Sequence, residues 1–153
     1  VPTFGSNYGI LKINERDPKA GIHEQSVRVA REIMADHASS IRRANEAGVK
    51  IAMGSDAFGW DQGENLLELD LMVRAGLTPM QALVAATSRA AECIGVQDRL
   101  GTVEAGKLAD ILVVDGDPLA DIKLFQNRDN LRVIMQDGKL YKNTLGQAPG
   151  DGK

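Results

Sequence analysis

The sequence predicts an α/β protein in two parts, with β/α repeat material up to residue 94 and a small β module after it. Two observations predict this arrangement. In the first part a long helical pattern ends directly before a short apolar run, as in β/α repeats whose parallel strands are buried on both faces. After Gly95 the helical patterns stop, and short strand patterns separated by turn residues take their place.

The first predicted helix lies between Gly21 and Gly48. Apolar or small residues recur in it at steps of three and four, which is the period of an amphipathic helix. These residues are Val27, Ala30, Ile33, Met34, Ala38, Ile41 and Ala44. Gly48 suits the C-terminal stop of the helix, and residues 49–53 are expected to form a buried strand.

Two further helices are predicted beyond that strand. One covers residues 64–75, a leucine-rich stretch that ends at Gly76. The other begins at Thr78, where Thr-Pro-Met-Gln supplies an N-cap, a proline at the first helical position and a glutamine at capping-box spacing. A break in this alanine-rich helix is expected near Thr87, and its end at Gly95.

Three short strands are predicted in the second part, at residues 110–115, 131–136 and 139–141. Asp137-Gly138 lies between the last two, and this dipeptide is favoured in two-residue hairpin turns. The last ten residues, 144–153, form a polar tail rich in glycine that we expect to be disordered.

Composition excludes several classes of function. The 153 residues are 43% hydrophobic and 25% charged, without an apolar run long enough to span a membrane. A net charge of −3, with its basic residues scattered, argues against a nucleic-acid surface. The single cysteine, Cys93, cannot form an internal disulfide, and no signal segment is evident, so a reducing cytoplasm is the expected compartment.

Asp56 is the principal candidate for chemistry. It follows the predicted strand 49–53 directly, in Gly54-Ser55-Asp56, and the carboxyl ends of strands are where β/α barrels carry their functional residues. Two interpretations stay open. Aspartate is common after strands as an N-cap or Asx-turn residue. Alternatively, a carboxylate beside a cation stays ionised and serves as metal ligand or general base.

Three motifs carry a resemblance to a known family. They are Gly-Val-x-Ile-Ala-x-Gly-Ser-Asp at residues 48–56, Gly-x-Thr-Pro-x-x-Ala-Leu-x-Ala-Ala-Thr at 76–87 and Gly-x-Val-Glu-x-Gly-Lys-x-Ala-Asp-Ile at 101–111. Together they resemble the C-terminal third of the metal-dependent amidohydrolase superfamily, in its imidazolonepropionase-like and Xaa-Pro dipeptidase-like branch. The similarity covers residues 44–142, and it extends more weakly to residues 1–3, which resemble the end of the penultimate strand.

The resemblance implies a fold and a division of the chain. Such enzymes are (β/α)8 barrels with a small β-sandwich made from both chain ends. Residues 1–94 would be the C-terminal part of the barrel, with its last strand and helices, and residues 95–143 the C-terminal strands of the composite sandwich, before the tail at 144–153. Asp56 would be the aspartate of the eighth strand, which binds the metal and shuttles the proton of the attacking hydroxide.

The chain departs from the family pattern in its metal ligands. Complete members carry a His-x-His on the first strand, a bridging residue on a middle strand and two further histidines, and none of these is present here. Catalytic zinc takes about three protein ligands, and a barrel needs about 250 residues. We therefore expect the 153 residues to be a C-terminal portion of an amidohydrolase that is inactive alone and binds zinc only with ligands outside the chain.

The remaining candidates concern substrate contacts. Trp60, Asn65 and His23 are predicted to contact substrate, although Gln62 stands where relatives carry a histidine. His37 falls on the apolar stripe of its helix and is expected to be a satisfied histidine facing the core. Cys93 is expected to be a small buried hydrophobe.

The predicted function is hydrolysis of a C–N bond in an amide, peptide or cyclic amide by metal-activated water, with Asp56 as ligand and base. The expected partners are a small-molecule or short peptide substrate and the remainder of the barrel, and a homo-oligomer is compatible with the sequence. The alternative is a non-catalytic structural or assembly fragment that lacks the metal site. A phospho-receiver domain, suggested by residues 111–118, is not expected, because the residues after Asp115 are predicted to form a hairpin and a tail instead of further β/α repeats.

Overall fold

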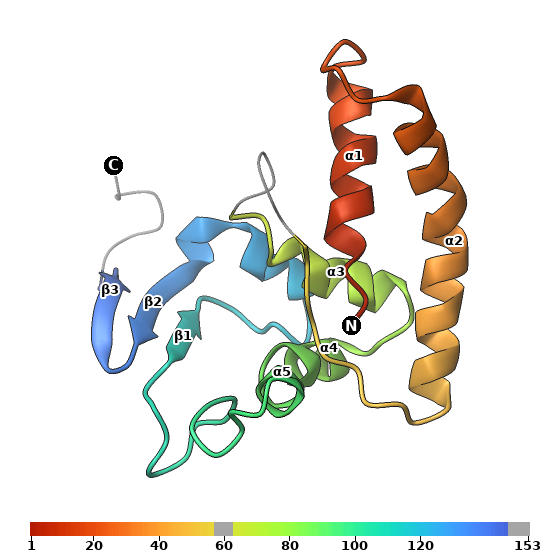
Figure 1. Ribbon diagram of the computed structural model, residues 1–153. Coiled ribbons are helices and arrows are strands. Elements are labelled where there is room, and N and C mark those ends of the chain that lie inside the picture. The colour runs from red at the N-terminus through yellow and green to blue at the C-terminus, as the bar shows by residue number, and fades with distance from the viewer. Residues whose placement is uncertain (57–62, 147–153) are drawn as a thin grey trace.

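A computed structural model describes residues 1–56 and 63–146. The described elements are, in chain order, α1 (Phe4–Arg16), α2 (Glu24–Glu46), α3 (Leu67–Arg74), α4 (Pro79–Ala86), α5 (Ser88–Cys93), β1 (Ile111–Val114), the 3-10 helices η2 (Ile122–Gln126) and η3 (Arg128–Asn130), β2 (Leu131–Gln136) and β3 (Lys139–Asn143). Figure 1 shows α1 and α2 as a long antiparallel hairpin at one end of the molecule and the strands at the other, with the shorter helices between them.

The helices predicted after residue 20 are confirmed. α2 lies within the predicted limits and buries Val27 and Ala30 of its apolar stripe. At α4 the capping box is present, because the Thr78 side chain accepts from the Gln81 backbone N–H and the Gln81 side chain accepts from Thr78 N–H. The helix is interrupted at Thr87, between α4 and α5, as the sequence predicts.

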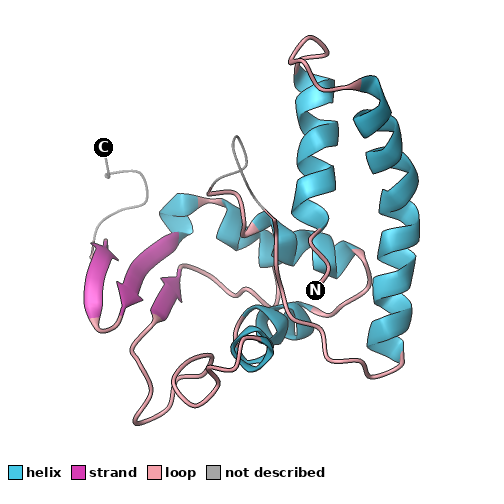
Figure 2. Cartoon of the chain, viewed as in Figure 1, coloured by secondary structure: helices cyan, strands magenta, loops and turns pink. Residues whose placement is uncertain are grey.

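The strands after residue 110 are also confirmed as a three-stranded antiparallel sheet in the order β1-β2-β3. Asp137 and Gly138 form the two-residue turn, and both have positive φ, 49° and 75°, as a type I′ hairpin requires. Figure 2 shows these strands grouped at one end of the molecule, with helical turns directly before β2.

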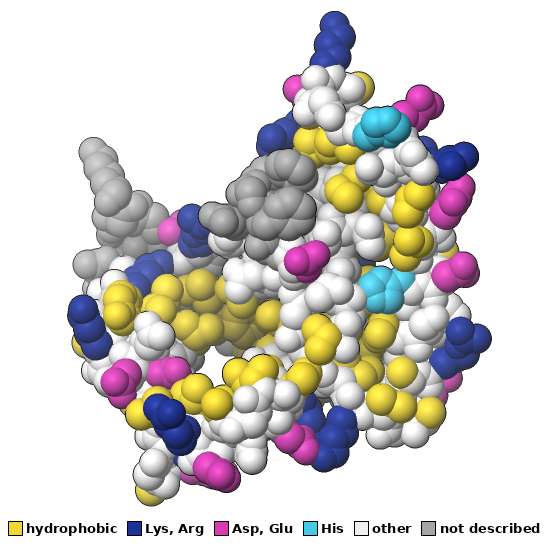
Figure 3. Space-filling model, viewed as in Figure 1, with side chains coloured by type: hydrophobic (Ala, Val, Ile, Leu, Met, Phe, Trp, Pro, Cys, Tyr) yellow, Lys and Arg dark blue, Asp and Glu magenta, His cyan; other side chains and the backbone are white. Residues whose placement is uncertain are grey.

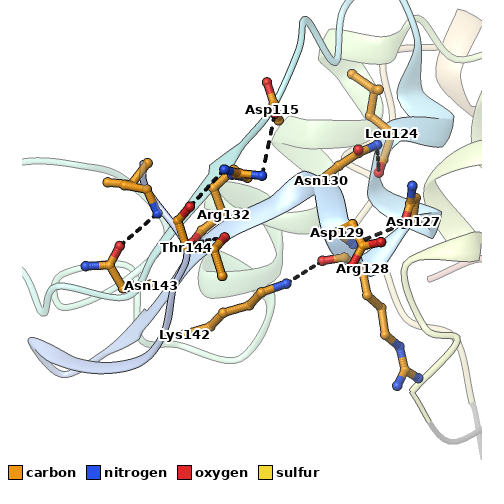
Figure 4. Close-up of polar contacts among 11 residues, drawn as sticks. Asp115, Leu124, Asn127, Arg128, Asp129, Asn130, Arg132, Lys142, Asn143 and Thr144 are labelled. Atoms are coloured by element: carbon orange, nitrogen blue, oxygen red, sulfur yellow. Dashed lines mark hydrogen bonds and ion pairs between the residues drawn. The ribbon is translucent and has the colours of Figure 1, made fainter. Parts of the chain in front are cut away.

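Side chains hold the sheet to the 3-10 helices that precede β2 (Figure 4). Lys142 Nζ donates to the Arg128 carbonyl at 2.6 Å, and Asn130 Nδ2 donates to the Leu124 carbonyl at 3.0 Å. Arg132 Nη2 donates to the Thr144 carbonyl at 2.8 Å, and the Thr144 N–H donates back to the Arg132 carbonyl. The predicted tail therefore begins with a residue that is bonded to β2.

The main hydrophobic core lies where α3 and α4 meet α1 and η2. Its fully buried members include Phe4, Leu69 and Met72, and η2 adds Ile122 and Phe125. Among the described helices, none is long and apolar enough to cross a lipid bilayer.

Two expectations need correction. Residues 49–53 do not form a strand, because strand pairing needs a neighbouring strand and none of the described strands lies beside them. α1 was not expected from the sequence, because Gly5 and Gly9 lower its helix propensity and Thr3 gives no side-chain cap. The carboxylate of Glu68, distant in the sequence, supplies that cap.

Candidate functional site

The candidate site is built at the end of the extended segment 49–56. The Val49 N–H donates to the Ala44 carbonyl at 3.0 Å, and the Met53 N–H donates to the Ala85 carbonyl at 2.9 Å. These two bonds tie the segment to the end of α2 and to α4. Asp56, at its end, is exposed and has φ 50°.

The first residues of the chain pack along this segment. A Cβ placed on Gly54 would lie 2.6 Å from Val1 Cγ1, and a Cβ placed on Gly5 would lie 3.0 Å from the Ser55 carbonyl oxygen. A side chain at Gly54 would force Val1 to shift, and one at Gly5 would force the Ser55 backbone to move by a few tenths of an ångström. Figure 1 shows residues 1–3 and 51–56 running in the same direction.

Both of these segments end in a left-handed residue that is not glycine. Thr3 has φ 55° and Asp56 has φ 50°. This conformation costs about 1–2 kcal/mol for a residue with a Cβ, and less for aspartate, whose side chain bonds locally. Such strain persists only where the surroundings fix the backbone, and it gathers at functional sites. Here the surroundings include a side chain that the sequence analysis missed.

That side chain is Glu68 of α3, which is 0% exposed. Its Oε1 accepts from the Phe4 N–H at 2.9 Å and its Oε2 from the Gly5 N–H at 2.8 Å. Burial raises the pKa of the Glu68 carboxyl, while the backbone N–H groups of Phe4, Gly5 and Thr3 oppose the rise. A sequence signal existed, because Glu68 shares a helix face with the buried Leu71 and Met72 at positions i+3 and i+4.

Of the predicted substrate-contacting residues, Asn65 and His23 lie in the described part of the chain. Asn65 is exposed in the turn before α3, and its carbonyl accepts from the Glu68 N–H at 3.2 Å. Trp60 lies outside the described residues. His23 is exposed and caps α2, its Nδ1 accepting from the Gln25 N–H at 3.2 Å. The hairpin places His23 at the far end of α1, a helix about 20 Å long at 1.5 Å per residue.

Two further expectations are corrected in part. His37 does face the core, with its ring 4.3 Å from that of Phe4, but its buried Nδ1 has no hydrogen-bond partner among the described residues. Burial lowers the pKa of His37, and the Pro2 carbonyl opposes this. Cys93 is exposed rather than buried, because it ends the six-residue helix α5 on the outer side.

A pocket of about 320 Å³ lies between the turn before α3 and the sheet, and Asp56 is not among its lining residues. Apolar side chains dominate its wall, which is lined by Gly63, Glu64, Leu66, Leu67, Phe125, Gln126, Arg128, Leu131, Ile134 and Lys142. Figure 3 shows hydrophobic side chains gathered in the hollow between sheet and helices. The pocket is a seam between the two parts of the chain, apart from the candidate carboxylate.

The described residues do not fit a complete metal site. No group of three or more His, Cys, Asp or Glu side chains converges within the part of the chain that the structure describes. A catalytic zinc takes about three protein ligands. Within the described part of the chain, Asp56 therefore has no partner ligands with which to complete such a site.

The comparison with protein families identifies the class of protein. The Amidohydrolase family model matches residues 8–141. Because this match covers most of the chain, the chain belongs to the amidohydrolase family.

Individual relatives of known name match part of their own length. An ochratoxinase from Aspergillus niger is 35% identical over 124 residues, which are 80% of this chain and 25% of that protein. An imidazolonepropionase from Thermoplasma volcanium is 31% identical over 97 residues, 62% of this chain and 24% of that protein. The chain therefore spans about a quarter of the length of these relatives.

Solved structures agree with this assignment. A Xaa-Pro dipeptidase with bound methionine in its active site is 34% identical, with a TM-score of 0.78 over 94% of this chain and 34% of that one. The A. niger ochratoxinase structure is 31% identical, with a TM-score of 0.75 over 99% of this chain and 34% of that one. The described fold is thus that of a part of these larger amidohydrolase structures.

Proposed function

We propose that this chain is part of a divalent-metal-dependent hydrolase, with zinc as the metal, that cleaves a C–N bond in an amide, peptide or cyclic amide. The observation that carries the proposal is the amidohydrolase match over residues 8–141. The relatives named above, an ochratoxinase, an imidazolonepropionase and a Xaa-Pro dipeptidase, support hydrolysis as the reaction. The substrate is a small molecule or a short peptide, and the metal ligands other than Asp56 lie outside this chain.

We further propose that residues 1–94 complete a (β/α)8 barrel and that residues 95–143 contribute to a composite β-sandwich. The packing of Val1 against Gly54 supports the first part, because consecutive strands of a barrel lie side by side and run in the same direction. The sheet supports the second part. Leu112 and Val113 alternate between its faces, yet they are 48% and 39% exposed, as expected of a sheet that lacks covering layers.

Asp56 is the proposed catalytic residue. It accepts the proton of the attacking water. A carboxylate at the end of an extended segment suits this role, because it is open to solvent while its backbone is fixed in position. Its left-handed backbone supports this role, since strained residues gather at functional sites. Trp60, Asn65 and His23 remain predicted substrate contacts. The cytoplasm remains the predicted compartment.

The test is Asp56→Asn in the complete protein, assayed against N-acyl amino acids, Xaa-Pro dipeptides and cyclic amides. Loss of the proton acceptor should lower kcat by about 10²-fold or more. The fold should stay intact, because Asp56 is exposed and asparagine tolerates the same backbone conformation.

Asp98→Asn provides the matched control. Asp98 is also exposed, and it lies in the turn after α5, so its turnover should equal that of the wild type. Wild-type turnover in Asp56→Asn would contradict the catalytic role. Absence of any C–N hydrolysis in the complete metal-loaded protein would favour the alternative, a structural or assembly piece.

A further inference from the structure

The buried carboxylate of Glu68 has a role that capping α1 does not fully explain. A buried charge costs several kcal/mol unless hydrogen bonds compensate. A helix end needs far less, because the hydroxyl of a local Ser or Thr suffices. Thr3 stands at that N-cap position, but its hydroxyl donates to the Pro2 carbonyl at 2.7 Å and gives the helix no cap. The cap comes instead from a residue 64 positions away.

Glu68 also acts on the segment that carries Asp56. The Cβ position of Gly5 lies 3.4 Å from Glu68 Oε2 and 3.0 Å from the Ser55 carbonyl oxygen. The first turn of α1 thus lies close to both the Glu68 carboxylate that binds its amides and the backbone of Ser55. Since Ser55 directly precedes Asp56, any shift of this turn moves the backbone on which the Asp56 side chain stands.

The left-handed backbone at Thr3 and Asp56 needs contacts that hold it in place, and the contacts of Glu68 and Ser55 with the first turn of α1, here called the clamp, can do so. Thr3 and Asp56 both have positive φ, and they lie at the ends of the two segments that meet at Gly5. The bonds from Glu68 fix the amides immediately after Thr3. They therefore oppose relaxation of the first strained residue and, through the contact of Gly5 with Ser55, of the second.

We propose that Glu68 is a positioning residue for Asp56, which acts by locking the first turn of α1 against Ser55. This inference rests on the proposed function of Asp56. It assigns to α3 a part in catalysis without contact to substrate or metal. Misplacement of a reacting group by about 1 Å costs up to about 10²-fold in rate.

The test is Glu68→Gln in the complete protein. The amide side chain keeps the volume but replaces one acceptor by a donor, so one of the two backbone N–H groups loses its partner. We expect kcat to fall about tenfold or more with KM within about twofold, since substrate binding does not use Glu68. Hydrogen exchange over residues 51–56, including the bonded Met53 amide, should become faster.

Asn127→Ala is the matched control, because it removes the side chain that accepts from the Asp129 N–H and caps η3 beside the sheet, at a cost of about 1 kcal/mol. It should lower the melting temperature and leave kcat unchanged. A Glu68→Gln variant that behaves like Asn127→Ala, with wild-type kcat and wild-type exchange over residues 51–56, would overturn the inference.

Gly5→Ala tests the same clamp if Glu68→Gln fails to fold. The added methyl group would lie 3.0 Å from the Ser55 carbonyl, so the carboxylate stays and only the spacing changes. The same fall in kcat is expected, and unchanged kcat would overturn the inference. The two proposals fail separately: wild-type turnover in Asp56→Asn refutes the proposed function, whereas wild-type exchange over residues 51–56 in Glu68→Gln refutes the positioning role.

Discussion

Glu68 and His37 are two polar side chains that lie beside the N-terminus of α1. The carboxylate oxygens of Glu68 have hydrogen-bond partners, whereas one ring nitrogen of His37 has none among the described residues. The carboxylate of Glu68 receives two backbone N–H groups, which offset much of the cost of its burial. The ring of His37 packs on Phe4, and its Nδ1 is buried without a partner among the described residues. His37 therefore carries an unsatisfied buried nitrogen, while Glu68 organises the backbone around it.

His37→Phe should stabilise the protein, most of all at acidic pH. Phenylalanine keeps the ring contact with Phe4 and removes the unpaired nitrogen, a gain of about 1 kcal/mol. It also removes the bond to the Pro2 carbonyl, but that carbonyl keeps the Thr3 hydroxyl as a donor. Burial holds the pKa of His37 below its usual 6.5, so the unfolded chain takes up the proton first as the pH falls. The wild type should thus lose stability as the pH falls through and below 6.5, and His37→Phe should lose less.

Thermal melts at pH 7.5 and pH 5.5 measure the difference. Met34→Leu on the same helix stripe is the control, because it keeps the volume and does not titrate. It should retain the wild-type dependence on pH. An equal loss of melting temperature in His37→Phe and the wild type would show that His37 does not carry this dependence.

At the scale of elements, the sequence predicted those parts of the fold whose signals are local. The capping box at Thr78, the stop at Gly48 and the Asp137-Gly138 turn are each set by residues a few positions apart. α1 was missed and the predicted strand at residues 49–53 was wrong, because the structure of both segments depends on distant partners. Glu68 supplies the cap of α1, and a strand at 49–53 needs neighbours that the described residues do not provide.

The candidate site divides in the same way. Asp56 was predicted from its place after an apolar run, and its catalytic role is still a prediction. Glu68 was missed because a glutamate in a helix normally faces solvent, and only its alignment with Met72 marks it as buried. Trp60 was predicted from a family pattern and lies outside the described residues.

The β2–β3 hairpin gives a prediction at this scale. Gly138→Val should destabilise the hairpin by about 2 kcal/mol, because a β-branched residue is strained at φ 75°. Asp137→Asn should be nearly neutral, since asparagine favours the same turn position. Hydrogen exchange of the β2 and β3 amides measures both. Equal protection in the two variants would mean that contacts with residues 109–110, which accept from the turn amides, fix the hairpin without help from the turn.

At the scale of the whole molecule, both faces of the described sheet carry apolar side chains that no other described element covers. Leu112 and Val113 of β1 and Leu140 and Tyr141 of β3 are all at least 39% exposed, and they lie on both faces of the sheet. β1 is an edge of the described sheet, and residues 49–53 are extended without a strand beside them. Apolar edges and faces of this kind recruit other strands.

Expressed alone, the 153-residue chain should therefore associate rather than remain a monomer. Placing a charge on the exposed edge, as in Leu112→Lys, should reduce association, because lysine at an edge opposes pairing with a second strand. Ser39→Lys on the exposed side of α2 adds the same charge away from the sheet, and it should associate like the wild type. Size-exclusion chromatography with light scattering measures the mass of all three. A monodisperse wild-type monomer of 16.4 kDa that unfolds cooperatively would contradict the prediction, because these residues would then close a core of their own.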